Sequence, residues 1–349
     1  MKEADMNDVS RAAHTVLFPI SHTFDTDGWF GDFLTRGGRS VLMASSAEEY
    51  AARRISDERR ARETAEHIRD FGARANARAG RPVVLAVDAE PAGVQRLEHL
   101  LPRIPGRADF PSRTDEQLHA AFGAYGAAAR ELGVSMFVGP VLDVITGSNA
   151  WLTDRTMATE LAEAGRIGAA YTTAVQAHGV TAMAKHFPGH PDLPANAIYA
   201  DVVLDLAADE VDRNIEPFRR LIAEGVGSVM VGPTVVTGID PVEPAATSKV
   251  LIDLLRAQGF SGIVVSDDLD AASTMRGRSL GEVAVASVAA GVQMLLIPGA
   301  RQHVSECVDA LVHAVGAGEL ALEVLQSAAA AVDSLADRSV TLAAQPTRT

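Results

Sequence analysis

Eight short runs of β-branched or otherwise apolar residues recur along this chain, and a longer amphipathic or alanine-rich stretch follows each of them. The runs span residues 15–20, 40–44, 83–87, 134–138, 180–184, 228–231, 263–265 and 293–297. This alternation is typical of parallel strands joined by crossover helices. Because the runs are almost continuously hydrophobic, the strands should be covered on both faces. Eight such units predict a closed, TIM-like (β/α)8 barrel of the α/β class.

The stretches between the runs predict helices over residues 47–74, 114–132, 158–178, 208–224, 249–258 and 280–289. No Ser/Gly/Pro-rich linker divides the pattern, so we expect a single barrel domain over residues 1–342. A further helical stretch over 302–338 either completes the outer ring of helices or packs across the bottom of the barrel, and both alternatives stay open. Residues 343–349 contain a proline and show no periodicity, which predicts a disordered tail.

The charge balance excludes several classes of partner. The chain has 31 Lys and Arg against 45 Asp and Glu, a formal net charge of −14, and this charge repels nucleic acid and anionic membrane surfaces. The first residues show no signal-peptide pattern, and no stretch approaches the roughly 20 apolar residues of a membrane span. We therefore expect a cytoplasmic monomer or homodimer with a small-molecule partner and no cofactor. The single cysteine, Cys307, cannot form an internal disulfide, which fits a reducing compartment.

Polar residues follow several of the predicted strands directly. They are Asp88 after the third run, Asp143 after the fourth, Lys185 and His186 after the fifth, and Asp267 after the seventh. Residues just past the C-terminal ends of barrel strands converge on one mouth, where barrel enzymes carry their active sites. An aspartate after a strand is often only a helix N-cap. The run Lys-His-Phe-Pro-Gly-His at 185–190, however, combines a Pro-Gly turn with an ammonium and two imidazoles, and this combination predicts a functional site.

Two motifs make the chain resemble a known family. Lys-His-Phe-Pro-Gly-His at 185–190 is followed by Gly-Phe-Ser-Gly-Ile-Val-Val-Ser-Asp-Asp-Leu at 259–269. In this order they resemble the paired signature of the bacterial cytosolic β-N-acetylhexosaminidases of glycoside hydrolase family 3. Weaker matches extend the resemblance over residues 17–298. It implies a barrel enzyme that hydrolyses β-linked N-acetylhexosaminides or related glycosides.

The resemblance also implies roles for individual residues. Asp267 matches the nucleophile, which in a retaining glycosidase attacks the anomeric carbon and forms a covalent glycosyl-enzyme. Its neighbour Asp268 is either a helix cap or a site residue. Charged hydrogen bonds to the sugar hydroxyls fix the ring and strengthen as the oxocarbenium-like transition state develops. Four residues match the family positions that make such substrate-binding contacts: Asp88, Arg155, Lys185 and His186.

The sequence departs from the family where the general acid/base should be. In the relatives a histidine paired with an aspartate follows the first motif, whereas an ungapped alignment places Ile198 and Asn196 at these positions. Neither side chain delivers a proton near neutral pH. The sugar pocket also differs, because 90–93 read Glu-Pro-Ala-Gly instead of Glu-Gly-Gly-Arg, 232–233 read Gly-Pro instead of Ala-His, and Gln293 replaces an acidic residue.

Three interpretations of the missing dyad stay open. The protein is a glycosidase whose acid is supplied by another residue, namely His190, Asp192, Tyr199 or Glu90. Alternatively, it acts by hydrolysis or transfer on an activated glycoside, such as a glycosyl ester, a glycosyl phosphate or a specialised-metabolite glycoside, whose leaving group needs no proton. In the third interpretation it is a sugar-binding barrel without turnover. General acid assistance is worth about 10²–10⁴-fold, so its loss alone does not abolish the reaction of a good leaving group.

A metal-dependent barrel hydrolase is the main rival class of enzyme. His186, His190, Asp192 and Asp267 are the side chains that would have to converge on a divalent ion. Their spacing does not favour such a site, because no His-x-His pair stands at a strand end. We therefore expect no metal.

Overall fold

The computed structural model describes residues 3–52 and 54–341, and its main sheet has eight parallel strands in the order β10-β7-β5-β4-β3-β2-β1-β11. The strands are β1 (Leu17–Ser21), β2 (Ser40–Met43), β3 (Val84–Asp88), β4 (Met136–Val138), β5 (Thr181–Phe187), β7 (Ser228–Val231), β10 (Ile263–Ser266) and β11 (Leu295–Ile297). A parallel bridge between Val265 and Met294 joins the two ends of this order and closes the sheet. The predicted (β/α)8 barrel is confirmed, and each barrel strand overlaps one of the eight apolar runs.

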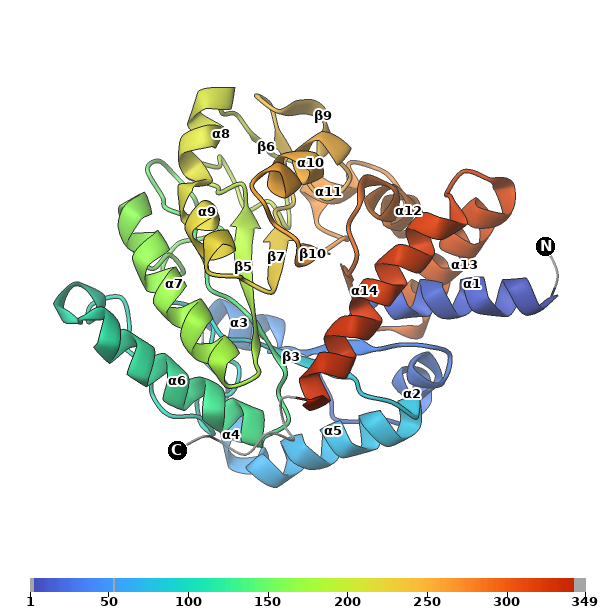
Figure 1. The fold of residues 1–349 in the computed structure, drawn as a ribbon, viewed down its shortest axis with the longest axis horizontal. Helices are drawn as coiled ribbons and strands as arrows, with labels where there is room; N and C mark the ends of the chain where they lie inside the picture. Colours follow the sequence, from blue (N-terminus) through green and yellow to red (C-terminus); the bar gives the residue numbers. More distant parts are fainter. Residues whose placement is uncertain (1–2, 53, 342–349) are drawn as a thin grey trace.

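Helices surround the barrel (Figure 1). They include α2 (Gly28–Thr35), α5 (Ala65–Ala79), α6 (Asp115–Glu131), α7 (Leu161–Ala177), α9 (Glu216–Ala223), α10 (Lys249–Ala257), α12 (Leu280–Ala290) and α13 (Arg301–Ala317). Successive helices pack on one another, as α6 does on α7 and α7 on α9. They cover the outer face of the strands, which explains why the strand sequences are apolar at almost every position.

Two of the predicted helices are divided in the structure. The stretch 47–74 forms α3 (Ala47–Ala52), α4 (Asp57–Arg62) and the first part of α5. The divisions follow from N-caps, because Ser56 accepts the N–H of Arg59 and Thr64 accepts the N–H of His67. The stretch 208–224 forms α8 (Ala208–Asn214) and α9, and Pro217 in the first turn of α9 lacks the N–H that a continuous helix would need.

The C-terminal helices take both of the positions that the sequence left open. α13 packs against α12 and α1 (Glu3–Val16) in the outer ring, whereas α14 (Leu322–Thr341) crosses the barrel (Figure 1). The apolar face of α14 joins the core cluster inside the barrel through Val332, Leu335 and Ala336. Buried Arg39, which directly precedes β2, pairs with Asp333 at 3.2 Å and with Asp337 at 2.6 Å. Helix α14 therefore covers the N-terminal end of the barrel and leaves the opposite mouth accessible.

A second, three-stranded sheet was not predicted. Its strands are β6 (Val203–Leu204), β8 (Val235–Val236) and β9 (Asp240–Pro244), in the order β6-β8-β9. β6 and β8 have two residues each, shorter than any run used for the barrel strands, and β9 reads Asp-Pro-Val-Glu-Pro, which is not an apolar run. Because these segments follow the C-terminal ends of β5 and β7, the small sheet belongs to the rim of the mouth.

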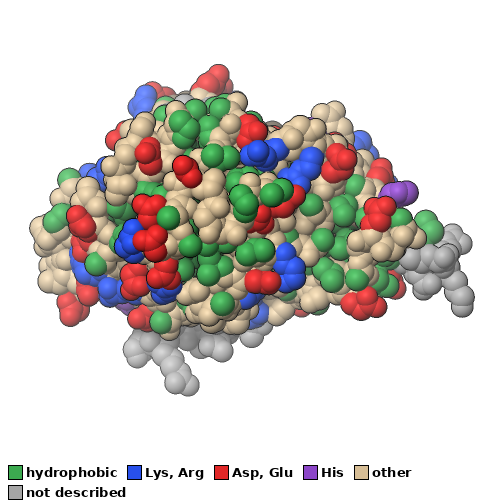
Figure 2. Space-filling model, turned by 90° about the horizontal axis from the view of Figure 1, so that it is seen from above, with side chains coloured by type: hydrophobic (Ala, Val, Ile, Leu, Met, Phe, Trp, Pro, Cys, Tyr) green, Lys and Arg blue, Asp and Glu red, His purple; other side chains and the backbone are tan. Residues whose placement is uncertain are grey.

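Side chains of both signs are interspersed over the face shown in Figure 2. No helix within the described parts of the chain is both long and apolar enough to span a bilayer. Cys307 is a free, buried thiol on α13, and burial raises its pKa to about 12. The boundary predicted at residue 342 and the tail predicted at 343–349 lie outside the described residues.

Candidate active site

Four of the five polar residues that the sequence placed at strand ends, all except the buried Asp143, meet in one cavity of about 520 Å³. Apolar side chains of the barrel interior, including Leu42, Val138 and Met230, form part of its wall. All five residues predicted to bind or attack a sugar line it: Asp88, Arg155, Lys185, His186 and Asp267. The lining also includes His22, Trp151, Asn196, Ile198, Tyr199 and Asp268.

Asp267 follows β10 directly and is 7% exposed. Its backbone N–H continues the strand ladder by donating to the carbonyl of Val231 at 3.1 Å, and its Oδ1 accepts the N–H of Asp268 at 2.9 Å. Its Oδ2 has no hydrogen-bond partner within residues 3–52 and 54–341. The site thus holds one carboxylate oxygen in place and leaves the other buried beside the cavity without a hydrogen bond.

A buried aspartate holds both histidines of the 185–190 motif. Asp143 Oδ2 accepts hydrogen bonds from Nδ1 of His186 at 2.8 Å and from its backbone N–H at 3.0 Å, and Oδ1 accepts the N–H of His190 at 2.8 Å. Burial alone would raise the pKa of Asp143, but the attraction of His186 and the hydrogen bonds from both histidines outweigh it and hold the pKa well below its usual range.

The imidazole of His186 is neutral near pH 7. Burial lowers its pKa more than the neighbouring carboxylates of Asp143 and Asp267 raise it. Because Nδ1–H is committed to the ionised Asp143, Nε2 is left as a hydrogen-bond acceptor. Nε2 can therefore accept a hydrogen bond from a hydroxyl group of a ligand in the cavity.

Glu90 neutralises the two cations of the site. Its Oε1 lies 2.7 Å from Nζ of Lys185 and 2.7 Å from Nη2 of Arg155, and its Oε2 accepts Nε of Arg155 at 3.1 Å. Burial would raise the pKa of Glu90, but the two cations outweigh it and hold the pKa well below its usual range. Glu90 is thus an ionised anchor for Lys185 and Arg155, and it has no proton to donate. Lys185 also lies 3.5 Å from Asp88.

Neither His190 nor Asp192, the two substitute acids favoured by the sequence, lines the cavity. His190 is fully buried, with Nδ1 3.2 Å from Asp143 and Nε2 3.2 Å from the hydroxyl of Thr234. Asp192 is exposed, and its Oδ1 accepts the N–H of Ser148 at 2.8 Å. Both side chains support loop structure in this arrangement. Among the four candidate substitutes, Tyr199 alone contributes to the lining, and it is 80% exposed.

The loop that carries Asn196 and Ile198 is fastened to the segment after Asp267. The N–H of Ala272 donates to the carbonyl of Ile198 at 2.9 Å, and the hydroxyl of Ser273 donates to the carbonyl of Ala200 at 2.7 Å. These bonds hold Asn196 and Ile198, the two positions that the ungapped alignment matched to the family's dyad, at the cavity. Their side chains place an amide and an aliphatic group at the cavity, and neither is an acid or a base.

Three lining residues were missed or left undecided by the sequence. His22 follows β1 directly, and its position just past an apolar run was the signal that could have identified it. Asp268 is not a helix cap, because α11 (Ala272–Met275) begins only after Ala271. Trp151 is buried, and its ring centroid lies 4.5 Å from that of His186, so it forms a wall of the cavity.

Two of the family departures also have structural explanations. Gly232 lies so close to the imidazole of His190 that a Cβ atom at this position would overlap it. Gln293 precedes β11, at the end of the barrel opposite the mouth, where its side-chain oxygen accepts Nη2 of Arg256 at 2.8 Å and the N–H of Val264 at 3.0 Å. The expectation that Gln293 alters the sugar pocket was therefore wrong.

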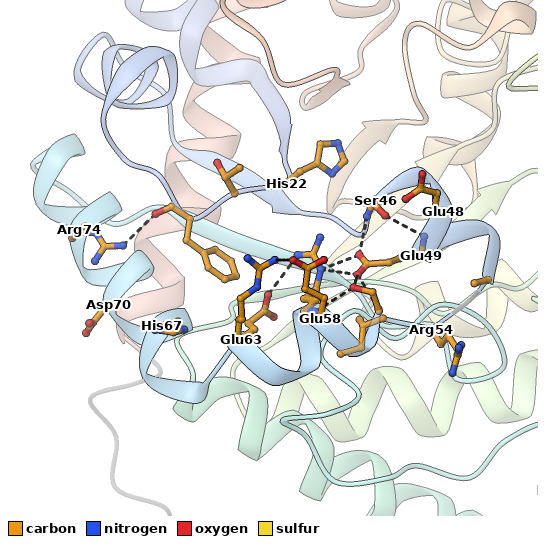
Figure 3. A pocket seen from close by; sticks show the side chains of 17 residues that line it. His22, Ser46, Glu48, Glu49, Arg54, Glu58, Glu63, His67, Asp70 and Arg74 are labelled. Carbon is orange, nitrogen blue, oxygen red and sulfur yellow. Dashed lines mark hydrogen bonds and ion pairs between the residues drawn. The ribbon is translucent and has the colours of Figure 1, made fainter.

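A larger cavity of about 860 Å³ adjoins the first at His22 (Figure 3). None of the predicted site residues lines it. Its buried acids are paired, since Glu63 lies 2.7 Å from Arg96 and Glu49 accepts hydrogen bonds from Ser56 and Arg59. Burial opposes this effect at Glu49, but the hydrogen bonds lower its pKa to about 2. The two buried acids of the larger cavity are thus both matched by partners.

The alternative of a metal-dependent hydrolase lacks a ligand set. Across residues 3–52 and 54–341, no group of three or more His, Cys, Asp or Glu side chains is placed to hold a metal ion. Of the four residues considered, Asp192 points away from the cavity and His190 is committed to Asp143 and Thr234.

The family model for the glycosyl hydrolase family 3 N terminal domain matches residues 50–335 of this chain. The chain belongs to glycosyl hydrolase family 3. The family resemblance inferred from the two motifs is therefore confirmed, together with the barrel fold that it implied.

Within family 3, the β-hexosaminidase of Nitrosomonas eutropha is 32% identical over 235 residues, which cover 62% of this chain and 65% of the relative. The β-hexosaminidase LpqI of Mycobacterium tuberculosis is 30% identical over 249 residues, covering 68% and 64%. The chain thus matches just under two thirds of the length of these relatives. A family 3 β-N-acetylglucosaminidase from Paenibacillus sp. has the same fold, with a TM-score of 0.86 at 24% identity over 97% of this chain and 64% of that one.

Proposed function

We propose that the protein is a retaining glycosidase of family 3 that uses Asp267 as its nucleophile on β-linked N-acetylhexosaminides or closely related glycosides. One observation carries the proposal. The Oδ2 atom of Asp267 lacks a hydrogen-bond partner in the described structure, although its residue lines a cavity rich in polar groups. A buried carboxylate oxygen left unsatisfied costs free energy unless it is used, and attack on an anomeric carbon is such a use.

The other polar lining residues suit the binding of a sugar ring. Lys185 and Arg155 are held by Glu90 and line the cavity, whereas Asp88 and the Nε2 atom of His186 offer acceptors there. Such a mixture of fixed donors and acceptors orients hydroxyl groups. A cavity of about 520 Å³ lies within the usual range for small-molecule sites.

The lining by Asn196 and Ile198 favours a particular class of substrate. Because these side chains cannot protonate a leaving group, glycosides whose leaving group departs as a stable anion, such as an ester, a phosphate or an acidic phenol, need no help from this loop and react fastest. Hydrolysis and glycosyl transfer both begin with the same attack by Asp267. The alternative interpretation, a sugar-binding barrel without turnover, predicts that the protein binds a sugar but forms no glycosyl-enzyme.

The test compares the wild type with Asp267→Asn on dinitrophenyl N-acetyl-β-glucosaminide and dinitrophenyl β-glucoside. Their leaving groups need no proton. We expect wild-type turnover and a loss of at least about 10³-fold in Asp267→Asn. Asp209→Asn, an exposed substitution on α8, is the matched control and should keep wild-type activity. Absence of turnover in the wild type, with N-acetylglucosamine still binding by calorimetry, would contradict the proposal and support the sugar-binding barrel.

A further inference from the structure

We propose that Asp268 supplies the proton that the loop at 191–199 no longer provides, an inference that rests on the proposed role of Asp267. Three carboxyl groups line the cavity. Asp267 is the nucleophile, and Asp88 lies 3.5 Å from the ammonium of Lys185. The side chain of Asp268 forms no hydrogen bond or ion pair with any other residue in the described parts of the chain, although its backbone N–H is fixed to Asp267 at 2.9 Å. It is thus a carboxyl group at the cavity that no structural role occupies.

The surroundings of Asp268 keep this carboxyl group protonated. The charged groups that act on it are Asp267 and Asp270 from its own loop, Asp88 at the end of β3, and Lys185 on β5. Burial and the three neighbouring carboxylates raise the pKa of Asp268 well above its usual range, against the opposing effect of Lys185. An ordinary aspartate would be ionised near pH 7, whereas burial and the neighbouring negative charges favour the protonated form of this one.

The spacing of the two aspartates fits the reaction. In retaining glycosidases the carboxyl groups of the nucleophile and the acid are about 5–5.5 Å apart. Consecutive Cα atoms are about 3.8 Å apart, and both side chains border the same cavity, so vicinal aspartates can span this separation around one anomeric carbon. Asp267 would contact the ring carbon and Asp268 the glycosidic oxygen.

The proposed steps balance as follows. Oδ2 of Asp267 forms a bond to the anomeric carbon as the glycosidic bond breaks, and the departing oxygen takes the carboxyl proton of Asp268. A water molecule then attacks the anomeric carbon, Asp268 takes a proton from that water, and the bond to Asp267 breaks. The net reaction is hydrolysis with retained configuration, and Asp268 ends in its starting protonated form.

The experiment measures kcat/KM of the wild type, Asp268→Asn and Asp268→Ser on N-acetyl-β-glucosaminides with dinitrophenyl and unsubstituted phenyl leaving groups. We expect both variants to lose about 10²–10⁴-fold on the phenyl glycoside and to stay within a factor of about three on the dinitrophenyl glycoside. With the dinitrophenyl glycoside, azide should raise kcat of the variants and yield the β-glycosyl azide, because this anion attacks the glycosyl-enzyme without a base. Wild-type rates on the phenyl glycoside should fall as pH rises through the pKa of Asp268, and this limb should vanish in the variants.

The alternatives give different results. Tyr199→Phe, His22→Gln and Asp88→Asn test other lining groups as the acid, the last because burial raises the pKa of Asp88. A selective loss on the phenyl glycoside in one of them, but not in Asp268→Asn, would overturn the proposal. An equal loss by Asp268→Asn on both substrates, without azide rescue, would reduce Asp268 to a structural role. Wild-type turnover that Asp267→Asn removes and Asp268→Asn leaves intact overturns only the role of Asp268. No turnover of the dinitrophenyl substrate in the wild type overturns the role of Asp267 as well.

Discussion

His186 Nε2 lies 3.9 Å from Oδ2 of Asp267, the oxygen that has no hydrogen-bond partner in the described structure. On its other side the same imidazole is held by Asp143 at 2.8 Å. A chain of contacts therefore runs from a buried loop aspartate through a neutral histidine to the carboxylate at the end of β10. This chain connects the two motifs that identify the family in the sequence.

Replacing Asp143 should weaken the series of contacts from Asp143 through His186 to Asp267. In the wild type, the backbone N–H and the ring Nδ1 of both His186 and His190 bond to the charged carboxylate of Asp143. Asp143→Asn removes this charge, and we expect the free energy of unfolding to fall by about 2 kcal/mol or more. Urea denaturation measures this change. Because the folded pKa of Asp143 lies below its unfolded value, this stabilisation is present above about pH 4 and is lost as the pH falls. The difference from wild type should therefore shrink toward acid pH. If the difference in unfolding free energy between the two proteins stayed constant toward acid pH, Asp143 would not be ionised in the folded protein as assigned.

Glu90→Gln should leave Lys185 and Arg155 buried without their common counter-ion. Breaking a buried pair on one side costs about 3–5 kcal/mol, and KM for any turned-over glycoside should rise as the two cations lose their positions. The matched control is Glu98→Gln, which removes an exposed pair with Arg60 and should cost less than about 1 kcal/mol. Equal effects of the two variants on thermal unfolding would refute the anchoring role of Glu90.

Asp268→Asn should stabilise the fold while it weakens catalysis. The folded pKa of Asp268 is raised, so the protonated carboxyl favours the folded state at low pH and this contribution is lost as the pH rises. At pH 8 the wild type must bear the cost of a buried negative charge, or of keeping the carboxyl protonated, at residue 268. The neutral amide of Asp268→Asn avoids this cost, so the variant should melt at a higher temperature than wild type at pH 8. The two proteins should converge below about pH 4, where Asp268 is protonated in both the folded and the unfolded chain. Calorimetric scans at several pH values test this, and a variant that melts below the wild type at pH 8 would contradict it.

Helix α14 should contribute to the stability of the barrel through its inner face. Leu335 is buried in the cluster inside the barrel, and Leu335→Ala should cost about 2–5 kcal/mol of unfolding free energy. Val324→Ala, at a more exposed position of the same helix, should cost less than about 1 kcal/mol. Denaturant titrations of both variants compare the two positions. Similar costs of the two substitutions would argue against packing of α14 on the N-terminal end of the barrel.

The barrel could be predicted from the sequence because its strands are covered on both faces and therefore stand out as apolar runs. The division of 47–74 at Ser56 and Thr64 was missed, since a single capping side chain leaves only a weak signal within a stretch of high helix propensity. The small sheet β6-β8-β9 was missed because β6 and β8 have only two residues each and β9 is largely polar.

The lining of the site was predicted better than the contacts within it. Asp88, Arg155, Lys185, His186 and Asp267 all line the cavity, because strand ends in a barrel converge whatever their spacing in sequence. His190 ends the 185–190 motif and Asp192 follows it, but His190 is buried in the protein and Asp192 is exposed to solvent. Side-chain direction in a loop depends on distant partners such as Thr234 and Ser148, which no local pattern reveals.

The most direct test of the central proposal is to trap the glycosyl-enzyme. Wild-type protein and Asp267→Asn would each be incubated with 5-fluoro-N-acetyl-β-glucosaminyl fluoride, whose second fluorine slows the release step, and then analysed by intact mass and peptide mapping. The account predicts one added 5-fluoro-N-acetylglucosaminyl group on the wild type, attached to Asp267, and none on the variant. An adduct on another residue, or turnover of dinitrophenyl glycosides with no adduct at all, would contradict Asp267 as the nucleophile.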